Sequence, residues 1–197
     1  MKYSLLSPPI PMPHWLSELE LRRKGARMDS PEEKIRFVID VALENVRRRT
    51  GGPFAAAIFN RQNELCALGV NLVMNSKQSF AHAEMTAIAN LQNQLRQTDL
   101  QSYLLASSCE PCVMCFGGIL WAGLSEMIYG APGSMPASIG FDEGDKVHDW
   151  KQSLEKRGIK VTGPFLEKEA FLPFQRYREQ AGNIYGIPPS RQKENSR

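Results

Sequence analysis

Two short groups of residues have the types and spacing needed for metal chemistry: His82-Ala83-Glu84 and Pro111-Cys112-Val113-Met114-Cys115. Each group stands where a helix is expected to begin. Cys112 and Cys115 lie three residues apart, so both side chains face the same side of a first helical turn. The partial positive charge at the start of that helix favours thiolates. One imidazole and two thiolates are a ligand set that zinc accepts, so His82, Cys112 and Cys115 are predicted to bind Zn²⁺.

Glu84 is predicted to be the proton carrier beside this metal. It lies two residues after His82, a spacing that places the two side chains on different faces of a helix, so it is not expected to be a fourth ligand. Three protein ligands leave a fourth position for water, whose pKa zinc lowers from about 15.7 to about 7. A neighbouring carboxylate can pass that proton to a substrate nitrogen. The expected reaction is hydrolytic deamination, and the spacing matches the H-x-E and P-C-x-x-C signature of zinc nucleobase deaminases.

The cysteines also admit other interpretations. A ferredoxin-type iron–sulfur cluster needs a further cysteine four positions after Cys115, where Ile119 stands. A structural zinc site closed by Cys109 as a fourth ligand leaves Glu84 without a role. A cysteine nucleophile with His82 as its base needs a free thiolate and an oxyanion hole.

The surrounding sequence predicts alternating strands and helices. Asp29-Ser30-Pro31 supplies an N-cap and a proline at the first helical position, and apolar residues follow at intervals of three or four. The segments FAAAIF (54–59) and ELCALGVNLVM (64–74) form a predicted β-hairpin. The later order of elements indicates an α/β sheet covered by helices, with parallel crossovers in its second half. The predicted helices span 15–24, 31–49, 81–95, 111–123, 149–157 and 167–180, and the further strands span 102–108, 126–132 and 159–165.

The composition fits one globular domain and a small-molecule substrate. The chain has 197 residues, of which 42% are hydrophobic. Residues 1–27 carry five basic and two acidic side chains and residues 190–197 carry three and one, so the body between them is slightly negative. Nucleic-acid binding rests on clustered basic residues, so no nucleic-acid partner is expected. No apolar run approaches the ~18 residues of a membrane span, and we expect no membrane partner and a cytoplasmic location.

Three regions are expected along the chain. Residues 1–28 form an N-terminal extension that begins with a proline-rich arm. Residues 29–186 form the deaminase domain, whose C-terminal segment (166–186) carries several aromatic residues. The polar residues 187–197 are expected to form a disordered tail.

Six segments carry a resemblance to a known family. They are GGPFAAAI (51–58), GVN (69–71), AHAEMTAI (81–88), SSCEPCVMCFGGILWA (107–122), IGFDE (139–143) and LPFQRYRE (172–179). With these segments the chain resembles the cytidine deaminase superfamily of zinc-dependent nucleobase deaminases, and within it the bacterial guanine deaminases. The resemblance implies a three-layer α/β/α cytidine-deaminase-like fold with a mixed five-stranded sheet. It also implies hydrolysis of guanine to xanthine and ammonia, with Zn²⁺ as cofactor.

The resemblance assigns further site residues. Asn71 matches the asparagine that hydrogen-bonds the purine, and Phe54 and Trp121 match aromatic positions near the substrate, beside the zinc ligand His82. Glu143 matches an acid that carries a proton to the leaving amine, although an aspartate is usual there. In such guanine deaminases the C-terminal segment crosses to the partner subunit and caps its site. Tyr185 is the nearest match to the terminal tyrosine, and we expect a homodimer that exchanges this segment.

Other functions stay open on the sequence alone. Aminotriazines share the N–C(NH₂)=N fragment of guanine and could fit the same pocket. A tRNA adenosine deaminase shares the zinc motifs but needs a basic RNA-docking face. Cytosine or nucleotide deamination is a further alternative. A different class is a zinc-stabilised interaction module without catalysis, which four protein ligands would favour.

Overall fold

One mixed sheet of five strands, in the order β2-β1-β3-β4-β5, forms the centre of this computed structural model, which describes residues 10–185. β1 (Ala55–Phe59) pairs antiparallel with β2 (Leu65–Val70) and with β3 (Leu104–Cys109). β3, β4 (Glu126–Ala131) and β5 (Lys160–Thr162) run parallel to one another. The predicted hairpin and the parallel second half are therefore confirmed.

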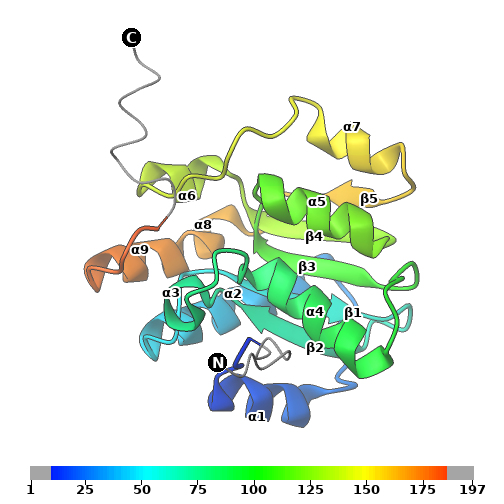
Figure 1. Cartoon of the computed structure of the whole chain (residues 1–197), viewed down its shortest axis with the longest axis horizontal. Helices are drawn as coiled ribbons and strands as arrows, with labels where there is room; N and C mark the ends of the chain where they lie inside the picture. The colour runs from blue at the N-terminus through cyan, green and yellow to red at the C-terminus, as the bar shows by residue number, and fades with distance from the viewer. Residues whose placement is uncertain (1–9, 186–197) are drawn as a thin grey trace, which may run out of the picture.

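Helices cover both faces of this sheet and give three layers, as Figure 1 shows. α2 (Pro31–Arg47), α8 (Glu167–Ala170) and α9 (Leu172–Glu179) share one core cluster with Ala57. α4 (Ala83–Leu95), α5 (Val113–Ala122) and α7 (Trp150–Glu155) share the other cluster with Ile58. Neighbouring residues of a strand point to opposite faces, so β1 contributes to both cores. The α/β/α expectation is confirmed.

Local sequence signals account for the start of α2. The hydroxyl of Ser30 accepts a hydrogen bond from the Glu33 N–H at 3.1 Å, and the Glu33 carboxylate accepts one from the Ser30 N–H at 3.1 Å. This capping box satisfies two backbone donors at the helix start, and Pro31 has no N–H to satisfy.

The second hairpin strand ends earlier than predicted. β2 stops at Val70, not at residue 74, and α3 (Val73–Ser76) follows. The side-chain oxygen of Asn71 accepts a hydrogen bond from the Val73 N–H at 3.4 Å, a local bond that favours a turn over continued strand. The turn ends the strand where the Asn71 side chain lines the site described below.

The C-terminal half also differs from expectation in detail. The single helix predicted over 167–180 is wrong: the chain forms α8 and α9, with a break at Phe171. Pro173 in the first turn of α9 has no N–H to continue the preceding helix. A short helix, α6 (Ser134–Ser138), was not predicted, and the strand expected over 159–165 is limited to β5.

The N-terminal helix α1 (His14–Arg23) packs beside the edge strand β2. Leu16 is fully buried in the core shared with α2, and the Glu20 carboxylate accepts a hydrogen bond from the Leu68 N–H at 2.7 Å. This contact covers an edge that would otherwise expose unpaired backbone groups. The boundaries 1–28, 29–186 and 187–197 stay a prediction, and the predicted tail lies outside the described residues. Within residues 10–185, no helix has the length and apolar character needed to cross a membrane.

Candidate active site

The three predicted metal ligands meet where α4 and α5 begin. His82 is the N-cap of α4 and Cys112 the N-cap of α5, and Cys115 lies in the first turn of α5. Nδ1 of His82 lies 3.4 Å from Sγ of Cys112, and the potential ligand atoms of all three residues lie within 4.8 Å of one another. Tetrahedral zinc with ordinary bond lengths separates a nitrogen and a sulfur ligand by about 3.6 Å. The cluster therefore fits zinc in both donor type and spacing.

The two thiols differ in their ease of ionisation. A side-chain hydrogen bond with Cys115, opposed by burial and aided by His82, lowers the pKa of Cys112 to about 4. The same contact with Cys112, together with burial, raises the pKa of Cys115 well above its ordinary value. One thiolate is thus present at neutral pH without metal, and the second thiol must lose its proton when a metal binds.

Glu84 lies beside these ligands and is buried. Its Oε1 accepts a hydrogen bond from Oγ of Ser107 at 2.9 Å, and its Oε2 accepts one from Sγ of Cys115 at 3.4 Å. Burial, followed by the negative charge of Cys112, raises the pKa of the Glu84 carboxyl. A raised pKa suits a group that takes up and returns a proton near neutral pH. Ser107, at the end of β3, was not singled out in the sequence.

A small cavity opens onto the ligand cluster. Its walls include five of the predicted site residues besides the zinc ligands His82 and Cys112. Four further lining residues received no predicted role. The lining residues are Phe54, Asn71, His82, Ala83, Glu84, Glu110, Cys112, Phe141, Asp142, Glu143 and Tyr185. The rings of Phe54 and Phe141 meet edge to face, with centroids 5.1 Å apart. Apolar walls with a few converging polar groups are typical of a small-molecule site.

The loop that carries Glu143 is fixed to the start of α5. The carbonyl oxygen of Glu143 accepts a hydrogen bond from the Val113 N–H at 3.0 Å, and Nζ of Lys146 donates to the Pro111 carbonyl at 2.8 Å and pairs with Glu110. Burial, followed by the charge of Cys112, raises the pKa of Glu143 to about 8. A carboxyl with that pKa can hold a proton at neutral pH.

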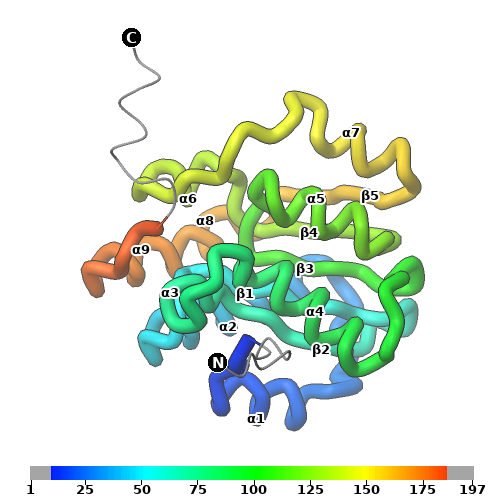
Figure 2. The backbone as a smooth tube through the Cα atoms, in the orientation of Figure 1, coloured from blue at the N-terminus to red at the C-terminus, as the bar shows by residue number. Residues whose placement is uncertain are grey.

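The C-terminal segment closes one side of the same cavity. Nδ2 of Asn71 donates a hydrogen bond to the hydroxyl of Tyr185, whose ring lies edge to face against Phe141 with centroids 5.2 Å apart. In Figure 2 the chain leaves α9 on the same side of the molecule as α3 and α6. Tyr185 therefore reaches the site of its own chain in this structure.

Among the residues predicted to bind substrate, Trp121 is the one that does not line this cavity. Its side chain is 85% exposed on α5. The prediction for Trp121 matched an aromatic residue type, and residue type alone does not show which side of α5 faces solvent.

The matching family model is the cytidine and deoxycytidylate deaminase zinc-binding region, and it covers residues 28–131. The chain belongs to this deaminase family. A curated relative, the guanine deaminase of Bacillus subtilis, is 35% identical over 153 residues, which are 76% of this chain and 95% of the relative. This relationship extends the deaminase resemblance beyond the zinc-binding region.

Two solved structures of similar proteins share the fold of this deaminase. The guanine deaminase from Nitrosomonas europaea is 34% identical, with a TM-score of 0.82 over 91% of this chain and 98% of that chain. NE0047 in complex with 2,6-diaminopurine is 35% identical, with a TM-score of 0.83 over 90% of this chain and 95% of that chain.

Proposed function

We propose that this protein is a zinc-dependent aminohydrolase that converts guanine and water to xanthine and ammonia. The observation that carries the proposal is the cluster of His82, Cys112 and Cys115 with Glu84 beside it, at a cavity that Asn71 also lines. The relatives whose names state guanine deamination cover 76% and 91% of this chain. The complex of NE0047 with 2,6-diaminopurine supports a purine-sized ligand.

Zinc, when bound to His82, Cys112 and Cys115, supplies a Lewis acid that lowers the pKa of water. Glu84 lies beside these ligands and takes the proton of the attacking water, then delivers it toward the purine ring. Attack at C2 of guanine gives a tetrahedral carbon from which the protonated amine leaves as ammonia. Glu143, whose pKa of about 8 leaves it protonated at neutral pH without metal, is proposed to donate to that amine.

Asn71 and the aromatic walls are proposed to select the substrate. An asparagine amide offers both a donor and an acceptor to the edge of a purine. The Phe54 and Phe141 rings and Tyr185 enclose the cavity, so a flat base can be held away from bulk water. His82 belongs to the metal cluster and also lines the cavity.

The alternatives are less favoured. The slightly negative body gives a tRNA adenosine deaminase no evident RNA-docking face. A zinc-stabilised interaction module needs a fourth protein ligand, and the cluster that could hold a metal among the described residues contains three. Cytosine, nucleotides and aminotriazines are tested with guanine in the experiment below.

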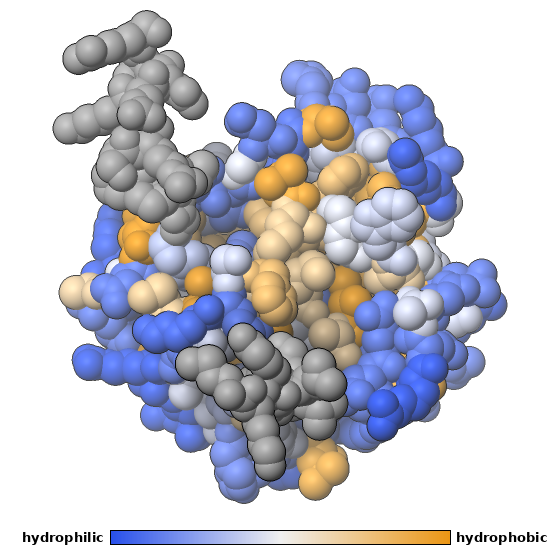
Figure 3. All heavy atoms as spheres, in the orientation of Figure 1, coloured by the Kyte–Doolittle hydropathy of each residue, from blue (hydrophilic) through white to orange (hydrophobic). Residues whose placement is uncertain are grey.

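We propose that the protein is a homodimer located in the cytoplasm. Figure 3 shows pale and orange atoms over the centre of the face where α5 lies, and Trp121 and Val113 on α5 are 85% and 43% exposed. α5 contains no charged residue, which suits contact with a second copy. In the single chain of this structure, Tyr185 lines the cavity of its own chain. Exchange of the C-terminal segment between subunits would require a dimer and stays a prediction. Sedimentation of Trp121→Glu and of the unsubstituted protein tests the dimer, and we expect the variant to be monomeric. A variant that remains dimeric would exclude this face of α5 as the dimer interface.

The function is tested by ammonia release from zinc-loaded protein over guanine, adenine, cytosine, their nucleosides and an aminotriazine. We expect guanine to give the highest kcat/KM. Turnover of another base without release from guanine would replace the proposed substrate, and no turnover of any base would favour the non-catalytic alternative.

A further inference from the structure

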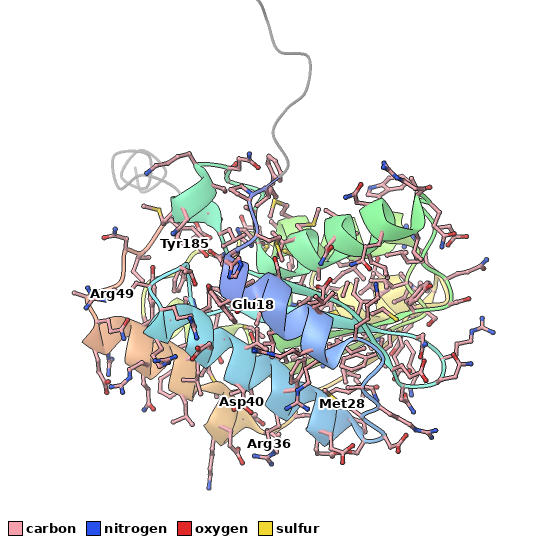
Figure 4. The ribbon with its side chains drawn as sticks, turned by 90° about the horizontal axis from the view of Figure 1, so that it is seen from below. Glu18, Met28, Arg36, Asp40, Arg49 and Tyr185 are labelled. Atoms are coloured by element: carbon pink, nitrogen blue, oxygen red, sulfur yellow. The ribbon has the colours of Figure 1, made fainter. Side chains whose placement is uncertain are left out.

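A chain of hydrogen bonds, partly buried at Trp15 and Thr50 and buried at Asn45, joins α1 to the backbone of Asn71. Nε1–H of Trp15 donates to Oγ1 of Thr50 at 3.0 Å, and the Thr50 hydroxyl donates to Oδ1 of Asn45 at 2.7 Å. Nδ2 of Asn45 donates to the carbonyl of Gly52 at 2.8 Å and to the carbonyl of Asn71 at 3.1 Å. In Figure 4, which views the molecule from below, α1 with the labelled Glu18 lies beside α2, and both helices contribute to one core cluster.

The hydrogen bonds from Trp15 through Thr50 to Asn45 can run in only one direction from donor to acceptor. An indole N–H can only donate, so the Thr50 oxygen accepts from Trp15 and directs its single proton to Asn45. The Asn45 amide is then fixed with its oxygen toward Thr50 and its two N–H bonds toward two carbonyls. Asn45 is fully buried, and every polar atom of its side chain has a partner. Complete networks of this kind hold their members in one geometry.

Asn45 ties together the two strand ends that carry substrate-site residues. Gly52 precedes β1 and Phe54, whereas Asn71 directly follows β2. The Asn71 N–H also donates to the Phe54 carbonyl at 3.1 Å. A Cβ on Gly51 would lie 1.8 Å from the Asn71 carbonyl oxygen, so only glycine permits this close approach.

We propose that Asn45 is a positioning residue for the substrate-binding side chain of Asn71, and that Trp15 of α1 fixes Asn45 through Thr50. The proposal rests on the proposed function for its substrate, guanine. α1 precedes residues 28–131, which the family model matches, so a segment outside that region supports substrate recognition.

Kinetics in a double-mutant cycle test the proposal. Asn45→Ala removes the bonds to the Gly52 and Asn71 carbonyls and the bond from Thr50. It is expected to raise KM for guanine by about tenfold, with kcat changed by less than about threefold, because their loss displaces Asn71 without touching the metal site. In an Asn71→Ala background the same change is expected to alter KM by less than about twofold. Thr50→Val is expected to behave like a weaker Asn45→Ala, and Thr50→Ser to restore the KM.

Asn90→Ala is the matched control. The Asn90 amide also links a helix to β2 and to α1, through the Leu68 carbonyl at 3.1 Å and Glu20 at 2.7 Å, but it does not contact Asn71. We expect its KM for guanine to change by less than about twofold. Equal rises in KM for Asn90→Ala and Asn45→Ala, or additive effects of Asn45→Ala and Asn71→Ala, would overturn the proposal.

Hydrogen exchange provides a readout that does not depend on the substrate. Trp15→Phe removes the first donor with little change in shape, and we expect faster amide exchange at 52–54 and 69–73 than in the unsubstituted protein. Unchanged exchange in these segments would contradict the role of Trp15. If the unsubstituted protein releases no ammonia from guanine, the proposed function fails, and the exchange measurement still decides whether the network fixes Asn71.

Discussion

The side-chain amide of Asn71 donates a hydrogen bond to the hydroxyl of Tyr185, so two predicted site residues that are far apart in sequence meet in one cavity. The contact joins the end of β2 to the end of the described chain. It makes Tyr185 a wall of the cavity, where its ring also lies against Phe141 and near His82.

Replacement of Tyr185 separates the role of its ring from that of its hydroxyl. Tyr185→Phe keeps the ring and loses one hydrogen bond, so kcat/KM for guanine is expected to fall by no more than about fivefold. Tyr185→Ala opens the cavity to water and is expected to lower kcat/KM by at least about tenfold. Steady-state kinetics of both variants check this, and an alanine variant as active as the phenylalanine variant would show that the ring does not close the site.

Glu143→Gln tests the proposed proton donor. The amide keeps the size of the side chain but cannot release a proton, so kcat for guanine is expected to fall about 10²- to 10⁴-fold. Zinc content, measured by atomic absorption, should not change, because Glu143 is not one of the three clustered ligands. A kcat within a few-fold of the unsubstituted protein would mean that Glu143 is only part of an acidic loop.

The pair of Lys146 and Glu110 is expected to stabilise the loop that carries Glu143. Both side chains are largely buried, and Lys146→Met leaves the Glu110 carboxylate without its cation, at a cost of about 3 kcal/mol in the free energy of unfolding. The matched control is Lys160→Met, whose pair with Glu126 is exposed at Lys160 and is worth no more than about 1 kcal/mol. Urea unfolding of both variants compares them, and equal losses would argue against a special role for Lys146.

Glu44 of α2, which does not line the active-site cavity, is expected to make the stability of the protein depend on pH. Hydrogen bonds from Arg47, and then from Arg48, lower its pKa from the ordinary value of 4.5 to about 2. Because the folded-state pKa is lowered, the stabilisation is present above pH 4.5 and is lost as the pH falls toward 2. Glu44→Gln should therefore reduce stability at pH 7, by no more than about 1 kcal/mol, and the difference should disappear near pH 2. A difference that grows in acid would contradict this assignment.

The metal cluster could be predicted from sequence because its determinants are local. Helix starts at His82 and Cys112 follow from short-range signals, and the spacing of Cys112 and Cys115 sets their common face. The strands themselves also followed from apolar segments and turn residues, and such features depend on neighbours within a few positions. The assembly of five strands into one mixed sheet was implied by the family resemblance.

The remaining site features depend on contacts between distant segments. The bond from Asn45 to Asn71 spans 26 residues and that from Trp15 to Thr50 spans 35, so no periodicity reveals them. The exposure of Trp121 depends on which face of α5 packs on the sheet. The turn at Asn71 and the helix break at Phe171, just before Pro173, are set by single residues that strand and helix patterns do not take into account.

Glu84→Gln gives the most direct test of zinc-dependent guanine deamination. The amide cannot take a proton from water, whereas His82, Cys112 and Cys115 remain available to the metal. Zinc content and ammonia release from guanine are measured on the same samples of the variant and the unsubstituted protein. The account predicts equal zinc in both, with ammonia and xanthine formed in equal amounts by the unsubstituted protein and a loss of at least about 10²-fold in the variant. Full ammonia release by a zinc-loaded variant would contradict it.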